Sequence, residues 1–325
     1  MHKNILITGG CGFVGSELVK HLLKKGYFVK VLDLQIYGSN LNDHPNLKLI
    51  KGDIRDEKIV DIATKSIDAV IHLACISNDP SFELNPTLGK SINLDSFLPF
   101  LNICKKNKIK KFIYASSSSV YGIKNIKNVS EQEELEPITD YSKYKAECEK
   151  ILFNHKSDMV KTVIRPATVC GLSSRLRLDL VINIITKHAF FDNKIKIFGG
   201  DQLRPNIHLM DMIDAYTLLL ETDDTLVDKK IYNVGFQNLS LNEIGTTVRD
   251  IIGPRLDVET IKTDDNRSYH ISSNKIFDEL NYKPKRKIED AINELKNYFE
   301  DFSDKKEFEK DKYYNIKRMQ NLKLK

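Results

Sequence analysis

The chain has 325 residues and no tryptophan; 41% of the residues are hydrophobic and 29% are charged. This ordinary globular balance predicts one or two closely packed domains. Much of the formal charge of +5 lies in residues 304–325, which hold eight Lys or Arg and four Asp or Glu, so the nearly neutral body argues against a nucleic-acid partner.

The amino terminus and the cysteines indicate the cellular compartment. The apolar run in MHKNILITGG is too short for a signal sequence, and no stretch approaches the roughly 20 apolar residues of a membrane span. The five cysteines are scattered and form no C-x-x-C pair, which is typical of reduced thiols. We therefore expect a cytoplasmic protein without a membrane span.

Residues 3–34, KNILITGGCGFVGSELVKHLLKKGYFVKVLDL, are the most informative segment. We expect a strand at residues 5–7, a glycine-rich turn, a helix from Ser16 to Gly26 and a second strand directly after it. The spaced glycines permit a tight turn, a close approach of backbone N–H groups to a pyrophosphate, and close packing of helix on strand. They predict a dinucleotide-binding loop that contains Gly9, Gly12, Phe13, Val14 and Gly15.

The second and third predicted strands end in acidic residues. Asp33 is placed to accept hydrogen bonds from an adenosine ribose, and its carboxylate would repel a 2′-phosphate, which favours NAD over NADP. The alternative is that Asp33 only starts a loop. The run LKLIKGDIRD ends the third strand at Asp53 and Ile54, which we expect beside the adenine ring. In the fourth strand, IDAVIHLAC, we interpret His72 as a packed residue, and no metal site is predicted because no ligand spacing matches one.

The spacing of the glycine loop and the IHLAC run resemble the extended short-chain dehydrogenases, specifically the sugar-nucleotide epimerase and dehydratase family. The resemblance covers about residues 3–300 and is most specific in the first 150. It implies that Leu73 and Ala74 also contact the cofactor. The implied fold is α/β, a Rossmann-type doubly wound parallel sheet with a smaller, discontinuous α/β substrate-binding lobe.

The same resemblance implies a division of the chain. Residues 1–170 would form the NAD-binding domain, with later returns near 205–235, and residues 171–300 would form most of the substrate-binding lobe. Residues 301–325 would be a basic tail, which we interpret as solvated or as a short charged helix, with an anionic partner as the minor alternative.

The run YASSSSVYG follows a predicted strand, so its serines lie past the carboxyl end of that strand, where open parallel sheets bind ligands. The family has a catalytic Ser or Thr three residues before the valine of V-Y-G, followed by a Tyr-x-x-x-Lys pair. Ser117, Tyr141 and Lys145 match these positions. A second Tyr-x-x-x-Lys pair, Tyr313 and Lys317, lies in the basic tail and is expected by chance.

These three residues suit alcohol oxidation. A free phenol ionises near pH 10, so a tyrosine base needs its pKa lowered by about 3 units, or roughly 4 kcal/mol. Lys145 shares a helix face with Tyr141, and together with the positively charged nicotinamide ring it would stabilise the phenolate. Ser117 would orient the substrate hydroxyl. In 4,6-dehydratases the two positions after the catalytic Ser or Thr resemble an Asp-Glu pair that eliminates water. Here these positions hold Ser118 and Ser119, which disfavours dehydration.

The second half of the chain supplies candidate substrate residues. The segment LSSRLRLDLVINIITKHAF begins with arginines, which either bind a nucleotide sugar or only provide charge and capping at the start of a helix. The segment with Arg204, His208 and Asp211 resembles one of the family, and a guanidinium forks onto phosphate oxygens. We expect His208 and Asp211 to hold the fold. The predicted substrate-binding residues are Arg175, Arg177, Asn183, Arg204 and Arg267.

The resemblance implies NAD-dependent oxidation at carbon 4 of a GDP- or UDP-linked sugar, in bacterial surface-polysaccharide (capsule) biosynthesis. A 4-epimerase would return the hydride to the other face of the sugar, whereas a 4-dehydrogenase would release the keto sugar. The alternatives are a 4,6-dehydratase or reductase, and a non-catalytic NAD-binding sensor or scaffold. Relatives imply a homo-oligomer, either a dimer or a larger assembly.

Overall fold

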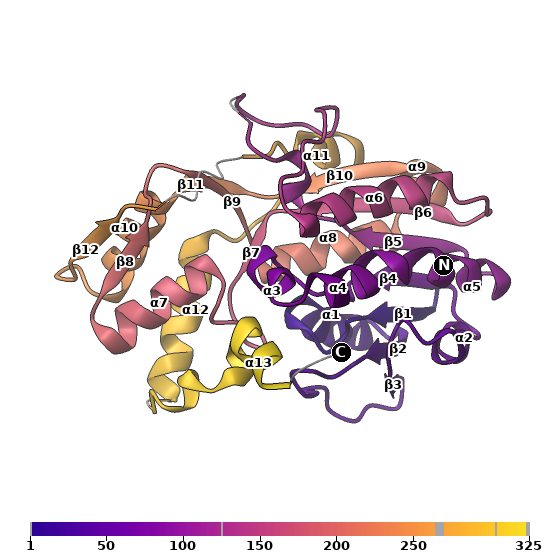
Figure 1. Ribbon diagram of the computed structural model, residues 1–325, viewed down its shortest axis with the longest axis horizontal. Helices are drawn as coiled ribbons and strands as arrows, with labels where there is room; N and C mark the ends of the chain where they lie inside the picture. Colours follow the sequence, from indigo (N-terminus) through magenta and orange to yellow (C-terminus); the bar gives the residue numbers. More distant parts are fainter. Residues whose placement is uncertain (1, 125, 264–269, 303, 323–325) are drawn as a thin grey trace.

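The structure, a computed structural model, describes residues 2–124, 126–263, 270–302 and 304–322. Its centre is a sheet of seven parallel strands in the order β10-β6-β5-β4-β1-β2-β3 (Figure 1). In chain order these strands are β1 (Asn4–Thr8), β2 (Phe28–Asp33), β3 (Leu47–Lys51), β4 (Ala69–His72), β5 (Lys111–Ala115), β6 (Val160–Pro166) and β10 (Lys230–Val234). The predicted doubly wound parallel sheet is confirmed.

Helices cover both faces of this sheet because its strands are apolar on both sides. In β1, Ile5 and Ile7 face one hydrophobic cluster and Leu6 faces another, as the two-residue period of a strand requires. The first cluster is covered by α1 (Phe13–Lys24), α8 (Leu209–Glu221) and α11 (Asn274–Leu280). The second is covered by α2 (Glu57–Thr64), α5 (Phe97–Lys106) and α6 (Asp140–Asn154).

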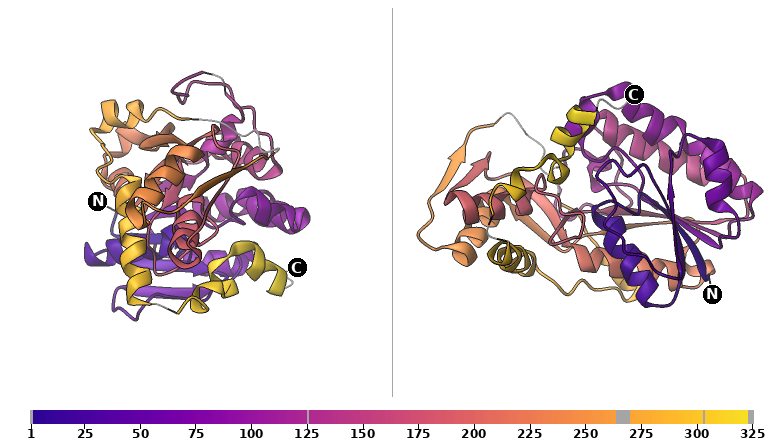
Figure 2. Two further views of the ribbon diagram at one scale, coloured as in Figure 1. Left: turned by 90° about the vertical axis from the view of Figure 1, so that its left-hand side faces the viewer. Right: turned by 90° about the horizontal axis from the view of Figure 1, so that it is seen from below.

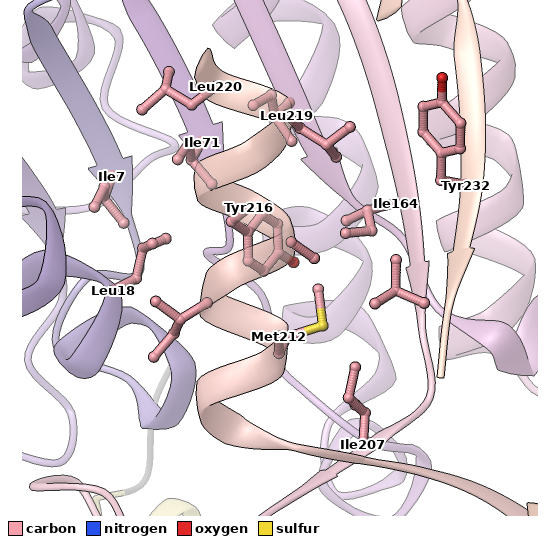
Figure 3. Packing of buried hydrophobic residues seen from close by; sticks show 14 of the residues in the cluster. Ile7, Leu18, Ile71, Ile164, Ile207, Met212, Tyr216, Leu219, Leu220 and Tyr232 are labelled. Carbon is pink, nitrogen blue, oxygen red and sulfur yellow. The ribbon is translucent and has the colours of Figure 1, made fainter. Parts of the chain in front are cut away.

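Helix α8 packs on one face of the central sheet, in the middle of the first cluster. Figure 3 shows Met212 and Tyr216 on this helix, among Ile7, Ile71 and Ile164 from three strands. All five side chains are at most 2% exposed. This packing fixes the strands whose carboxyl ends carry the predicted site residues.

Short elements follow the central strands. They are α3 (Asp79–Glu83), α4 (Pro86–Lys90), the π-helical turn η1 (Ser91–Asp95), the 3-10 turn η2 (Ser118–Tyr121) and α9 (Asp224–Val227). The helix expected from Ser16 instead begins at Phe13. The turn of the glycine loop therefore passes directly into α1, and no side chain caps its start.

A smaller lobe lies beside the sheet (Figure 2). It contains a three-stranded sheet, β11-β9-β7, and a two-stranded sheet, β12-β8. These strands are β7 (Thr168–Cys170), β8 (Ile195–Phe198), β9 (Leu203–His208), β11 (Gln237–Ser240) and β12 (Val258–Ile261). Its helices are α7 (Val181–Asp192), α10 (Leu241–Ile252) and α12 (Ile288–Asp301). The chain enters this lobe by passing from β6 into β7.

The C-terminal segment, defined here as residues 304–322, folds against the protein. It consists of η3 (Glu307–Glu309), η4 (Asp311–Tyr313) and α13 (Asn315–Leu322). Phe308 is fully buried among aromatic rings of the smaller lobe, and Met319 belongs to the second cluster of the central sheet. The short charged helix expected here exists as α13, and Phe308 and Met319 attach the C-terminal segment to the smaller lobe and to the central sheet. Figure 1 shows this segment between the two parts of the molecule. No helix among the described residues combines the length and apolar character needed to cross a bilayer.

Candidate active site

A pocket opens at the carboxyl ends of the central strands, where ligands bind in open α/β sheets. The glycine loop lines one side of it. A Cβ on Gly15 would lie 2.3 Å from the Gly9 carbonyl oxygen, so only glycine fits that turn of the helix against the loop. Gly9 itself has a φ of +72°, which favours glycine. The uncapped start of α1 leaves backbone N–H groups available to an anion.

The predicted adenosine side of the pocket is formed by the ends of β2 and β3. Asp33 accepts hydrogen bonds from the backbone N–H groups of Cys11 (2.9 Å) and Gln35 (2.6 Å). Burial raises the pKa of the Asp33 carboxyl, and these two donors oppose the rise. Ile54 lines the pocket, but Asp53 does not, because its carboxylate is engaged by the Arg55 guanidinium.

The remaining predicted cofactor residues lie nearby. Leu73 and Ala74, just after β4, line the pocket beside Gly9 of the glycine loop, and the Ala74 N–H donates to Thr8 Oγ1 over 3.3 Å. The site thus combines glycine backbone, an uncapped helix start and a carboxylate at the end of β2. These features fit a dinucleotide.

The three predicted catalytic residues converge on the far side of the pocket. Ser117 begins η2, and its Oγ accepts a hydrogen bond from the Ser119 N–H (3.1 Å). The Tyr141 hydroxyl is hydrogen-bonded to the Ser117 side chain. One turn along α6, Lys145 Nζ donates to the Ala115 carbonyl oxygen (2.6 Å) and lies 5.8 Å from the centre of the Tyr141 ring.

The protein's own groups set the pKa of the Tyr141 hydroxyl, and the lowering predicted above also involves the nicotinamide ring. Burial, the largest cause, raises this pKa well above its usual value, and the charge of Asp79 raises it further. Arg177 and the hydrogen bond from Ser117 act in the opposite direction. Lys145 by itself therefore does not bring the pKa of Tyr141 down, because burial outweighs the cations that the protein supplies.

His72 is a packed residue, as predicted. Its Nδ1 is hydrogen-bonded to Thr8 Oγ1 (3.0 Å), and its ring packs against Phe100 and Phe112. Burial lowers the pKa of His72 to about 3. Within the described part of the chain, no group of three His, Cys, Asp or Glu side chains is arranged to hold a metal ion.

The predicted substrate residues separate into three groups. Arg175, Arg177 and Arg204 line the pocket. Asn183 does not: its amide is buried and bonds the backbone N–H and carbonyl of Gly171, so it holds the loop after β7. Arg267 lies outside the described residues.

His208 and Asp211 hold the fold, as expected. The His208 ring accepts the Met210 N–H at the start of α8 (3.1 Å). The Asp211 carboxylate accepts hydrogen bonds from Arg286 Nη1 (2.7 Å) and from the Arg286 N–H (2.8 Å). Neither side chain lines the pocket.

Several lining residues were not predicted from the sequence. Tyr37, Ser77, Tyr216 and Asn315 all line the pocket. Asn315 is the least expected, because it comes from the C-terminal segment and no motif marks it. Tyr313 and Lys317, the chance match to Tyr-x-x-x-Lys, belong to this segment, and the Tyr313 hydroxyl donates to Glu307 rather than facing the pocket.

Comparisons with known proteins agree with this geometry. A model of the NAD dependent epimerase/dehydratase family matches residues 5–235. The UDP-glucose 4-epimerase of Lactobacillus helveticus is 29% identical over 317 residues, which cover 89% of this chain and 94% of that protein. The dTDP-D-glucose 4,6-dehydratase of Dictyostelium discoideum is 30% identical over 256 residues, covering 72% of this chain and 58% of that one. The crystal structure of Thermotoga maritima UDP-glucose 4-epimerase with UDP-glucose superposes with a TM-score of 0.83 at 26% identity, covering 93% of this chain and all of that one.

Proposed function

Because the chain belongs to the NAD dependent epimerase/dehydratase family and uses NAD as its cofactor, we propose that it oxidises carbon 4 of a nucleoside-diphosphate sugar. One observation carries the proposal. Ser117, Tyr141 and Lys145 meet in the same pocket as the glycine loop, although 108 residues separate Gly9 from Ser117 in the chain. A protein that only bound NAD would not need these three side chains together.

The residues around the pocket divide the work of holding the cofactor. The glycine loop would hold the diphosphate of NAD, Asp33 the adenosine ribose, and Lys145 the nicotinamide ribose. When bound, NAD supplies the acceptor for a hydride, which side chains cannot provide. Ile54, Leu73 and Ala74 would exclude water from the two rings.

Side chains of the protein would remove the proton of the sugar hydroxyl. In the proposed reaction Ser117 Oγ orients the hydroxyl on carbon 4, and Tyr141 first releases its own proton to solvent, after which the phenolate Oη accepts the proton of that hydroxyl. Because burial raises the pKa of Tyr141, the neutral phenol is the resting form, and cations near its oxygen must stabilise the phenolate. Arg177 is one such cation, and the ammonium of Lys145 is the second.

The neighbours of Ser117 favour a 4-epimerase or a 4-dehydrogenase over a 4,6-dehydratase. Elimination of water needs a carboxyl group beside the sugar, and Ser118 and Ser119 cannot supply one. Ser118 is buried, and Ser119 Oγ is hydrogen-bonded to Ser117 Oγ (2.8 Å). The relatives that are named UDP-glucose 4-epimerase align with nearly the whole chain, which supports a 4-epimerase activity.

The substrate is proposed to be a UDP- or GDP-linked sugar of bacterial surface-polysaccharide biosynthesis, handled in the cytoplasm by a homo-oligomer. Arg204, which is 8% exposed at the pocket, is the proposed ligand of the sugar-nucleotide diphosphate. A reductase remains the alternative enzyme activity, because it would use the same three catalytic residues in the reverse direction.

The test is incubation of the purified protein with UDP-, GDP- and dTDP-sugars, followed by NMR of the products. An epimeric sugar identifies a 4-epimerase, and a ketone or its hydrate identifies a 4-dehydrogenase. Tyr141→Phe should abolish product while NAD binding persists. If no sugar is converted and Tyr141→Phe matches the wild type in every binding assay, the protein is a sensor or scaffold.

A further inference from the structure

Two buried arginines at the pocket have side-chain nitrogens that lack a hydrogen-bond partner in the described part of the chain. Arg175 and Arg177 lie in the loop between β7 and α7 and are 3% and 8% exposed. Arg175 Nε and Nη1 and Arg177 Nη2 have no hydrogen-bond partner among the described residues. Burying a charged donor without an acceptor costs free energy, so these nitrogens are positioned to donate hydrogen bonds to an anionic ligand.

The two arginines differ in their pairing. The Arg177 guanidinium is paired with Asp179, with 2.9 Å between Nε and Oδ1. Among the described residues, the Arg175 guanidinium donates to the amide oxygen of Asn315 alone, and no carboxylate lies within ion-pair distance of it. Burial, the largest cause, and the neighbouring charge of Arg177 together lower the pKa of Arg175 to about 10. The excess positive charge of this cluster is therefore on Arg175.

Arg175 lies on the cofactor side of the pocket. Its Cζ is 3.8 Å from the centre of the Tyr37 ring, four residues beyond the ribose-binding position Asp33. Its backbone N–H donates to Ser173 Oγ (3.2 Å), and that hydroxyl donates to the Phe13 carbonyl oxygen (2.8 Å) in the first turn of α1. The unpaired guanidinium and the uncapped helix start thus face the same ligand space.

Asn315 of the C-terminal segment fixes this arrangement. Besides accepting from Arg175, it donates its backbone N–H to Asp179 Oδ2 (2.9 Å) and its amide Nδ2 to Ser77 Oγ (3.0 Å). The residue is 2% exposed. Beyond it, Arg318 Nε donates to the Ile36 carbonyl oxygen (2.8 Å) in the loop after β2. The segment therefore connects the arginine loop to the loops after β2 and β4.

We propose that Arg175 binds the diphosphate of the dinucleotide and that residues 304–322, through Asn315, complete the cofactor site. The free Nε and Nη1 of Arg175 can each donate to an oxygen of the diphosphate, and the helix start supplies further donors. This assignment moves Arg175 from the predicted sugar-nucleotide site to the cofactor site. The inference rests on NAD as the cofactor and is independent of which sugar is the substrate.

Isothermal titration of nucleotide-free protein with NAD, ADP and adenosine tests the assignment. Arg175→Gln should weaken binding of NAD and ADP about tenfold or more, because one charge-assisted contact is lost, and should leave adenosine unaffected. Arg249→Gln is the matched control: Arg249 pairs with Asp250 on α10, away from the pocket, and its loss should change none of the three affinities.

Asn315→Asp gives a second test that does not depend on the folding of Arg175→Gln. The new carboxylate would pair with Arg175 and replace the missing anion, so the melting temperature should rise while NAD and ADP bind less tightly. A structural role for Asn315 would lower the melting temperature and leave affinity unchanged, and this result would overturn the proposal.

The sugar-nucleotide assignment also has a distinct outcome. If Arg175→Gln weakens UDP, GDP or dTDP but not NAD or ADP, the arginine belongs to the sugar-nucleotide site and the proposal is wrong. None of these titrations needs turnover, so a failure of the proposed sugar chemistry would leave the result on Arg175 intact.

Discussion

Gly15→Ala should weaken NAD binding more than it destabilises the fold. A Cβ at this position would lie 2.3 Å from the Gly9 carbonyl oxygen and 2.7 Å from the Gly10 Cα, where ordinary contacts begin at 3.4 Å. The obstructing atoms are backbone, so no side chain can rotate away. The glycine loop must instead move by about 1 Å from the start of α1.

The size of the effect follows from this displacement. Overpacking of a close-packed site costs about 1–3 kcal/mol, and each 1.4 kcal/mol corresponds to a tenfold change in affinity. Because the loop that must move is the loop that would hold the diphosphate, most of the cost should appear in binding. We therefore expect NAD to bind about 5- to 150-fold less tightly.

Titration calorimetry with NAD measures this change, and thermal melting measures the stability of the free protein. Gly253→Ala is the control: Gly253 has an extended backbone, the nearest atom to its added Cβ would be 3.4 Å away, and it lies outside the pocket. If Gly15→Ala binds NAD within twofold of the wild type at an unchanged melting temperature, the loop does not hold the cofactor as argued.

Three further changes test the charges and the packing around the pocket. Tyr141 must lose its proton to act as a base, and the Arg177 cation lowers its pKa whereas Asp79 raises it. The rise of kcat/KM with pH should therefore move to higher pH in Arg177→Gln and to lower pH in Asp79→Asn. Shifts of both profiles in the same direction would contradict this electrostatic account. Glu149→Gln breaks a buried ion pair of 2.6 Å with Arg165 and should cost about 3–5 kcal/mol in urea unfolding; a loss below about 1 kcal/mol would show that the charge is dispensable. Phe308→Ala removes a fully buried ring, which should release the C-terminal segment to limited proteolysis and weaken NAD binding; a protease-resistant segment with wild-type affinity would show that the ring is not its anchor.

Much of the fold could be predicted because its signals are local. In β1, Ile5 and Ile7 alternate with Leu6, and this period alone indicates a strand buried on both faces. The glycine loop and Asp33 are likewise read within about 30 residues, the length of one strand-helix-strand unit. Their positions in the pocket follow from the topology of a parallel sheet.

The rest of the site depends on contacts that no local pattern records. Asn315 meets Ser77 across 238 residues of chain, and neither lies in a motif. Asn183 illustrates the opposite case. A polar residue among apolar ones on a helix predicts either a ligand or a buried structural bond, and its amide turned out to pair with both the N–H and the carbonyl of Gly171. An amide carries a donor and an acceptor, so it satisfies backbone as well as it binds a sugar.

The misplaced start of α1 has a functional reason. The helix was expected to begin at Ser16, and it begins at Phe13. The Ser16 hydroxyl is hydrogen-bonded to Ser173 Oγ (3.1 Å), and Gly12 precedes the first turn without a capping side chain. A capping side chain would occupy the N–H groups that a diphosphate needs. The same pocket holds the Arg175 nitrogens that lack a partner among the described residues, so these nitrogens and the uncapped start of α1 line one ligand space. A diphosphate would satisfy both, and the bound cofactor therefore belongs to the hydrogen-bond balance of the folded protein.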